Sequence, residues 1–132
     1  MKPVPPHAAK AIEALGNRSK ATTGQMMEDL ACRELCRAGL RLITRNYRCR
    51  GGEIDLVMQD GEDLVCVEVR YRRSDRFGTP AETVTATKRA RLLRAARHYL
   101  LYHASDVPVR FDVVAIAGPE ARMDWIRNAF TA

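Results

Sequence analysis

Asp55 and Glu68 are the residues whose types and spacing best fit a chemical role. Asp55 lies in residues 53–59 and Glu68 in residues 64–71, and both runs have the alternating composition of β-strands. An Asp-Gly pair at 60–61 joins the two runs, which is a strong signal for a hairpin turn. The sequence therefore predicts two carboxylates on neighbouring strands of one hairpin.

Either of two registers brings these carboxylates together. A two-residue turn pairs Gln59 with Glu62 and sets Asp55 opposite Cys66. Glu68 is then a diagonal neighbour on the same face, roughly 7–8 Å away at Cβ. A four-residue turn shifts the register by two residues and preserves the face of each side chain.

Two carboxylates beside a valine-rich core repel each other unless a cation neutralises them. Mg²⁺ takes oxygen ligands and is usually held by one or two carboxylates together with water and substrate phosphate. Arg70 shares a face with Glu68 and could donate hydrogen bonds to a phosphate oxygen. We therefore expect one or two Mg²⁺ or Mn²⁺ ions and phosphodiester hydrolysis. The alternative for the same residues is an exposed ladder of ion pairs.

A third carboxylate could come from a helix predicted at about 22–38. A capping box marks its start, and apolar residues up to Ala38 follow at helical spacing. Glu28 lies at the edge of this apolar stripe, and Glu34 lies nearer its centre. The helical pattern leaves both as candidates.

The remaining residues complete an α/β pattern. The next helix begins either at the Thr-Pro pair of residues 79–80 or near Thr85, and it continues to about His103. Further strands are expected at 40–48 and 111–117, with 123–130 as a candidate returning strand. The second helix must cross over to lay its strand on the sheet. The order α-β-β-β-α-β therefore predicts a mixed sheet flanked by helices.

The chain is basic, with 22 Lys and Arg against 16 Asp and Glu and a formal net charge of +6. A domain with this balance most often binds a polyanion, and nucleic acid, most often DNA, is the expected partner. A solvated basic surface without a partner is the alternative. The residues expected to contact nucleic acid flank the carboxylates or lie on the second helix: Arg45, Arg48, Arg72, Arg73, Lys88 and Arg91.

Length and hydropathy predict one cytoplasmic domain. The 132 residues fit a single core at 22–132, and residues 1–21 lack a periodic pattern and are expected to form a flexible extension. No apolar run approaches the ~18 residues that would cross a membrane, and none resembles a signal peptide.

The four cysteines lack zinc-binding spacing and are expected to act as small buried hydrophobic residues. They are Cys32, Cys36, Cys49 and Cys66.

Six short motifs are spread over about residues 22 to 130. They are Gly24-x3-Glu28-x2-Ala31, Arg45-Asn46-Tyr47-Arg48, Gly52-Glu53-Ile54-Asp55-Leu56, Val67-Glu68-Val69-Arg70-Tyr71-Arg72, Lys88 and Arg110-Phe111-Asp112-Val113. Together they resemble the bacterial YraN-like family, which is regarded as restriction-endonuclease-like and similar to archaeal Holliday-junction resolvases. The resemblance implies a metal-dependent endonuclease core in which Glu28, Asp55 and Glu68 hold the metal, and it favours Glu28 over Glu34. By analogy it also implies branched or irregular DNA as the substrate, with a homodimer as one possible assembly.

One position departs from the nuclease pattern that this resemblance brings. The last residue of the Glu-x-Lys signature is Arg70 here, and arginine keeps its charge at any ordinary pH, so it could hardly be a general base. We expect Lys88, near the start of the second helix, to reach Asp55 and Glu68 and to supply the missing ammonium. One alternative to a nuclease is a nucleic-acid-binding module without catalysis. Another is a protein-interaction subunit that docks on an acidic partner.

Overall fold

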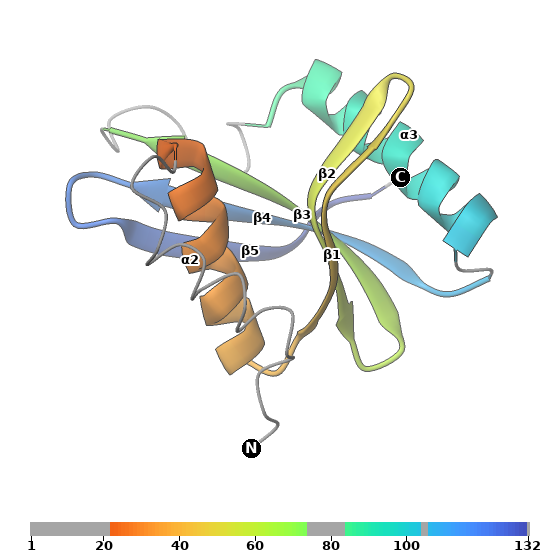
Figure 1. Cartoon of the computed structure of the whole chain (residues 1–132), viewed down its shortest axis with the longest axis horizontal. Helices are drawn as coiled ribbons and strands as arrows, with labels where there is room; N and C mark the ends of the chain where they lie inside the picture. The colour runs from red at the N-terminus through yellow and green to blue at the C-terminus, as the bar shows by residue number, and fades with distance from the viewer. Residues whose placement is uncertain (1–21, 74–83, 104–105, 132) are drawn as a thin grey trace.

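A computed structural model describes residues 22–73, 84–103 and 106–131. In these ranges two helices cover opposite faces of one five-stranded sheet (Figure 1). The elements are, in chain order, α2 (Thr23–Arg37), β1 (Arg41–Cys49), β2 (Gly52–Asp60), β3 (Asp63–Arg72), α3 (Ala86–His103), β4 (Val109–Ala117) and β5 (Arg122–Phe130). The predicted extension at residues 1–21 lies outside the described part of the chain.

The sheet is mixed, with strand order β1-β2-β3-β4-β5. Neighbouring strands are antiparallel except β3 and β4, which run parallel. A parallel pair needs a crossover connection, and α3 lies in the chain between these two strands. The candidate strand at 123–130 is β5, which pairs with β4. This arrangement confirms the predicted α/β class and is compatible with a restriction-endonuclease-like core.

The β2–β3 hairpin has the register of the longer expected turn. Gln59 pairs with Leu64, two residues beyond Glu62, and the further pair Asp60 and Asp63 closes a turn that consists of Gly61 and Glu62. Gly61 in the turn has φ +60°, a backbone conformation that favours glycine. The last paired residues toward the start of β2 are Leu56 and Val67, which directly adjoin Asp55 and Glu68.

Each helix packs on its own face of the sheet, and side chains of β2 and β3 alternate between the two cores. Buried residues on the α2 side include Ala31, Leu35, Leu56, Met58, Val65 and Val67. Buried residues on the α3 side include Ile54, Val57, Leu64, Leu92, Ala96, Tyr99 and Phe111. Three cysteines are buried as free thiols, which agrees with their expected role as small hydrophobic residues; they are Cys32, Cys36 and Cys66.

Local sequence sets the ends of α2. Thr22 and Gln25 form the predicted capping box, in which each side chain bonds the backbone of the other residue. The helix ends before Gly39, which has φ +106°. Ala38 was expected on the buried stripe, but it is exposed because it is the C-cap residue.

The start of α3 places a basic residue in its first turn. Thr85 Oγ1 accepts a hydrogen bond from the backbone N–H of Lys88 at 3.3 Å, so the later of the two expected starts is found. The Thr-Pro pair at 79–80, the earlier expected start, lies outside the described residues. Neither described helix is long and apolar enough to cross a membrane.

Candidate functional site

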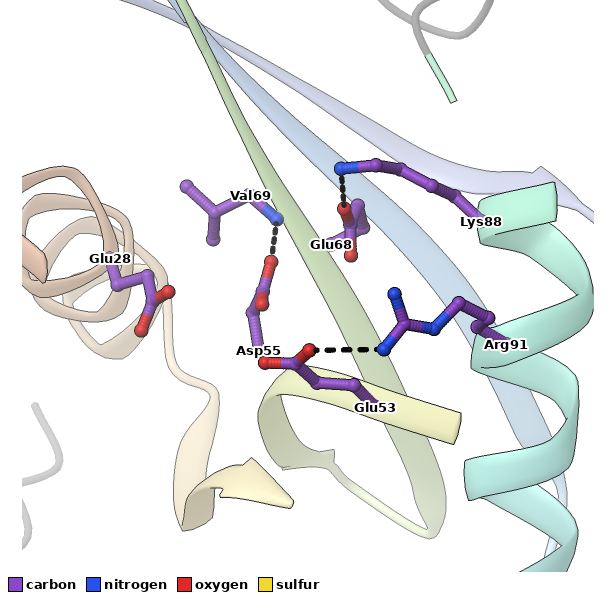
Figure 2. A pocket seen from close by; sticks show the side chains of 7 residues that line it. All are labelled: Glu28, Glu53, Asp55, Glu68, Val69, Lys88 and Arg91. Carbon is purple, nitrogen blue, oxygen red and sulfur yellow. Dashed lines mark hydrogen bonds and ion pairs between the residues drawn. The ribbon is translucent and has the colours of Figure 1, made fainter. Parts of the chain in front are cut away.

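A pocket lies between α2, α3 and the adjoining parts of β2 and β3 (Figure 2). It brings together four of the five residues predicted for catalysis, and the fifth, Arg70, lies beside it. The lining residues are Glu28 from α2, Glu53 and Asp55 from β2, Glu68 and Val69 from β3, and Lys88 and Arg91 from α3.

The two central strands lose their regular pairing at Asp55. The paired register of β2 and β3 ends at Leu56 and Val67. Ile54 packs toward α3 and Leu56 toward α2, although side chains two apart on a regular strand share a face. The Asp55 carboxylate accepts a hydrogen bond from the backbone N–H of Val69 at 2.8 Å (Figure 2). This contact satisfies a donor of β3 and fixes the direction of the carboxylate.

Asp55 and Glu68 line the pocket together. Burial raises the pKa of Glu68 to about 7, and the charge of Asp55 contributes to the rise. Burial also raises the pKa of Asp55. The pair therefore retains a proton more readily than exposed carboxyl groups do, and a divalent cation could replace that proton.

Two cations approach Glu68 from different elements. Lys88 Nζ lies 3.5 Å from Glu68 Oε1, and Arg70 Nη1 lies 4.0 Å from the same oxygen. Figure 2 shows the Lys88 side chain extending from α3 to this carboxyl group. The sequence predicted that the Lys88 ammonium reaches the carboxylates, and its position beside Glu68 agrees with that prediction. The chemical role of Lys88 stays a prediction.

Glu53 positions two of the predicted phosphate-binding residues at the pocket rim. Its carboxylate lies 3.4 Å from Arg48 and 3.7 Å from Arg91. The side chains of Arg48 and Arg91 are 72% and 53% exposed, so both remain accessible to a bulky anion. Sequence reasoning did not select Glu53, although the alternation of the 53–59 run places it on the same face as Asp55.

On the α2 side, Glu28 lines the pocket, and Arg45 contacts both Glu28 and the neighbouring Asp29. Arg45 lies 3.7 Å from Glu28 and forms a close ion pair with Asp29. Its side chain is only 20% exposed, so Arg45 orients Glu28 here, and its predicted contact with nucleic acid stays a prediction. Burial raises the pKa of Glu28 to about 6, with a contribution from the charge of Asp55. The rival candidate Glu34 is 42% exposed and lies outside the pocket.

Asp29 is a buried residue of this region that sequence reasoning missed. It lies three residues before Cys32 and seven before Cys36, so all three share one face of α2. Had the two cysteines been counted as part of the apolar stripe, Asp29 would have been placed on the buried face. A buried carboxylate needs a cationic partner, which Arg45 provides.

The other predicted phosphate contacts lie at the end of β3. Arg72 is the last residue of the strand, and Arg73 follows it and is exposed. Neither residue lines the pocket, and residues 74–83 lie outside the described part of the chain. The predicted role of Arg72 and Arg73 in nucleic-acid binding stays a prediction.

The donor set of the pocket fits a hard divalent cation. Within the described ranges, no three His, Cys, Asp or Glu side chains form a group that could hold a metal ion, so Glu28 does not complete a three-ligand site. Two carboxylates are nevertheless a usual protein contribution to a Mg²⁺ site, because water and substrate phosphate supply the other ligands. Asp55 and Glu68 are the residues that can make this contribution.

Comparison with known proteins places the chain in a family. The pattern described as "Uncharacterised protein family UPF0102" matches residues 27–116, well over half of the chain. The chain belongs to family UPF0102. A UPF0102 protein of Nitrosomonas europaea is 50% identical over 113 residues, which cover 85% of this chain and 96% of the relative. A UPF0102 protein of Dechloromonas aromatica is 46% identical over 121 residues, which cover 92% and 98%.

Membership in UPF0102 confirms the YraN-like resemblance carried by the short motifs. The matched residues, 27–116, include every residue that lines the pocket, from Glu28 to Arg91. The membership itself brings no assigned activity, so the function has to be argued from the pocket.

Proposed function

We propose that this protein is a metal-dependent nuclease that hydrolyses phosphodiester bonds in DNA. The observation that carries the proposal is the pair Asp55 and Glu68, two carboxyl groups that line one pocket with a basic rim. Carboxylates that can bind a cation, with an ammonium and guanidinium groups nearby, are suited to the negative charge of a phosphoryl transition state. The net charge of +6 supports a polyanionic substrate.

Asp55 and Glu68 are the proposed ligands of Mg²⁺ or Mn²⁺. Because burial raises the pKa of both groups, a cation bound there exchanges with a proton. The Val69 N–H already holds one Asp55 oxygen, so the carboxylate is oriented in advance. Glu28 contributes through water, since it does not complete a three-ligand group. When bound, the ion supplies a Lewis acid for the phosphoryl oxygen and lowers the pKa of water.

Lys88 and Arg70 are the proposed cations for the reacting phosphate. Both lie near Glu68, and the Lys88 side chain is 41% exposed. Once Glu68 has a stronger counter-charge, the Lys88 ammonium can turn toward a phosphate oxygen or orient water. Arg70 keeps its charge and stabilises the added negative charge of the transition state. Arg48 and Arg91 on the rim bind flanking phosphates and set the position of the strand.

Cleavage of labelled DNA tests the proposal. A four-way junction, a flap and a plain duplex are incubated with Mn²⁺ and, separately, with EDTA. We expect cleavage only with Mn²⁺, and preference among the three substrates reports whether irregular DNA is favoured. Asp55→Asn, which keeps the shape of the side chain, should cut at least about 100-fold more slowly. Lys88→Met should slow cleavage by about 100-fold while binding changes little.

Glu34→Gln is the matched control, because Glu34 lies outside the pocket. This variant should cleave as the wild type does. Full activity in EDTA, or full activity of Asp55→Asn, would contradict the proposal.

A nucleic-acid-binding module without catalysis is the second candidate. Lys88 and Arg70 already offset the charge of Glu68, so the pocket could persist without a bound metal ion. Such a module would bind DNA in a salt-sensitive manner, and neither Mn²⁺ nor Asp55→Asn would change that binding. Metal binding by Asp55 and Glu68 therefore separates the two candidates.

A further inference from the structure

α3 is positively charged from Lys88 to Arg97. Its 18 residues contain no Asp or Glu, and they include two histidines and five basic side chains: Lys88, Arg89, Arg91, Arg94 and Arg97. A helix with this composition attracts a polyanion, which is either a nucleic acid or an acidic protein segment. The charge alone does not specify which kind of nucleic acid lies along it.

One face of α3 leads from the pocket to its far end along the β1–β2 hairpin. Lys88, Arg91, His98 and Tyr102 recur at spacings of three, seven and four residues, which places them on one side of the helix. The contacts agree with this placement. Arg91 pairs with Glu53 of β2, and His98 bonds the Tyr47 hydroxyl of β1. From Lys88 to Tyr102 the helix rises by roughly 21 Å at 1.5 Å per residue.

The far end of this face carries a cluster of aromatic and histidine rings. The Tyr47 ring contacts His98, Tyr99 and His103, with centroids 5.2–5.7 Å apart. The Tyr102 ring also contacts His98, with centroids 4.5 Å apart and an interplanar angle of 39°. Tyr99 is buried, whereas Tyr102 is 66% exposed. The inner rings therefore hold the cluster in place, while the outer ring remains accessible.

Basic side chains connect this cluster to the pocket. The Arg94 guanidinium packs against Gly51 in the hairpin turn, where a Cβ atom would lie only 2.9 Å from Nη1. Arg50 in the same turn is exposed, and Arg48 and Arg91 border the pocket. A phosphate backbone that enters the pocket can thus remain in contact with cationic groups as it approaches Tyr102.

We propose that Tyr102 and His98 form a stacking site for an unpaired base of the nucleic-acid substrate. Bases of any sequence stack on an exposed aromatic ring, and in proteins that bind single strands such rings accompany a basic groove. The distance from Lys88 corresponds to roughly six base steps of 3.4 Å. The inference rests on the proposed nucleic-acid substrate and names its class: nucleic acid with unpaired bases on one side of the cut.

Binding of labelled oligonucleotides tests this inference. Fluorescence anisotropy of the full chain in EDTA compares oligothymidylate with a blunt duplex of equal length. Tyr102→Ala should weaken binding of the single strand by about 5- to 100-fold, the equivalent of one lost stacking contact. It should change duplex binding less than about twofold. Tyr102→Phe retains an aromatic ring and should bind as the wild type does.

Leu101→Ala is the matched control, since Leu101 is 77% exposed and adjacent to Tyr102. It should leave both affinities unchanged. Arg94→Ala should reduce the salt dependence of single-strand binding by about 0.7 of a log unit per log unit of salt, whereas Tyr102→Ala should not.

Three results would overturn the inference. They are unchanged single-strand affinity in Tyr102→Ala, an equal loss for single strand and duplex, and an equal loss in Leu101→Ala. Sedimentation velocity adds a fourth: if Tyr102→Ala dissociates a dimer as affinity falls, the residue contacts a second copy of the chain.

Because binding is measured without metal, an inactive protein that keeps its Tyr102-dependent single-strand preference contradicts only the proposed nuclease. Metal-dependent cleavage without a Tyr102 effect contradicts only the stacking site.

Discussion

At the residue scale, the central feature is a carboxyl pair that resists ionisation. Burial and the charge of Asp55 raise the pKa of Glu68, and the charges of Lys88 and Arg70 lower it only in part. The result is a pKa of about 7, against an ordinary value of 4.5. The folded protein therefore binds a proton at Glu68 over a pH range in which the unfolded chain has lost it.

This difference predicts how stability depends on pH in the absence of metal. The folded pKa of Glu68 is raised, so its contribution to stability is present below about pH 4.5 and is lost as pH rises through about 7. Glu68→Gln imitates the protonated acid and removes this loss. We expect its melting temperature in EDTA to match the wild type near pH 5 and to exceed it increasingly toward pH 8.

Glu34→Gln serves as the control, since it also removes one acidic charge but at a 42% exposed position. Its melting temperature should follow that of the wild type at every pH. A constant difference between Glu68→Gln and the wild type from pH 5 to 8 would contradict the raised pKa.

Part of this residue-scale arrangement could be predicted from the sequence. Strand alternation was enough to bring Asp55 and Glu68 together, because both possible registers preserve their faces. The contact of Arg45 with Glu28 and Asp29 could not be predicted, since it joins a helix to a strand across the core. The hydrogen bond from Val69 to Asp55 depends on a strand irregularity that no residue type signals.

At the element scale, the pocket depends on the close packing of α3 against the start of β2. A Cβ atom on Gly52 would lie 2.7 Å from the backbone N of Ala95 and 2.8 Å from the carbonyl oxygen of Arg91. These are backbone atoms of α3, which cannot move without the helix. Gly52 therefore sets the distance between the helix that carries Lys88 and the strand that carries Asp55.

Gly52→Ala is expected to force this helix away from the strand. We predict a loss of about 2 kcal/mol in the free energy of unfolding, as for overpacked cores, and weaker cleavage at temperatures where the variant is folded. Chemical denaturation and the cleavage assay measure the two effects. Gly24→Ala is the control, because its Cβ would meet only Thr22 Oγ1 at 3.9 Å and it should not destabilise α2. Equal stability of Gly52→Ala and the wild type would contradict the packing argument.

The elements themselves were largely predictable, because each has a local signal. The capping box at Thr22, the Asp-Gly turn before Glu62 and the cap at Thr85 all appear in the structure. Two registers of the β2–β3 hairpin fit the same turn residues, so the sequence does not distinguish them.

At the scale of the whole molecule, a buried ionic network holds the sheet together away from the pocket. The Asp112 side chain is fully buried and accepts two hydrogen bonds from Arg110, one from Trp125 Nε1 and one from the backbone N–H of Asn128. Arg110 also lies 3.0 Å from Asp60 in the β2–β3 hairpin. One carboxylate thus links β4 to β5 and, through Arg110, to the hairpin.

Asp112→Asn removes the charge and one acceptor from this network. We expect the free energy of unfolding to fall by about 3 kcal/mol, because Arg110 and its neighbours lose a buried counter-charge. Below the melting temperature, Mn²⁺ affinity should be unchanged, since the network does not line the pocket. Asp124→Asn, at an exposed position of β5, is the control and should leave stability within about 0.5 kcal/mol. Unchanged stability in Asp112→Asn would contradict this account of the sheet.

The overall architecture could be predicted from the order of the elements, whereas the ionic network around Asp112 could not. A helix between the third and fourth strands implies a crossover and hence a parallel pair, which is β3–β4. In the sequence, Arg110-Phe111-Asp112 carries only a family resemblance. Its partners, Trp125 and Asn128, lie on β5, and no turn or residue pattern predicts the register of that strand.

The most direct test of the central claim is calorimetric titration of the full chain with Mn²⁺ at about pH 8, comparing wild type, Asp55→Asn, Glu68→Gln and Glu34→Gln. We predict that wild type and Glu34→Gln bind the ion, and that the two pocket variants bind at least tenfold more weakly, roughly 1.4 kcal/mol. Absence of Mn²⁺ binding in the wild type, or equal binding by all four proteins, would contradict the assignment of Asp55 and Glu68 as metal ligands.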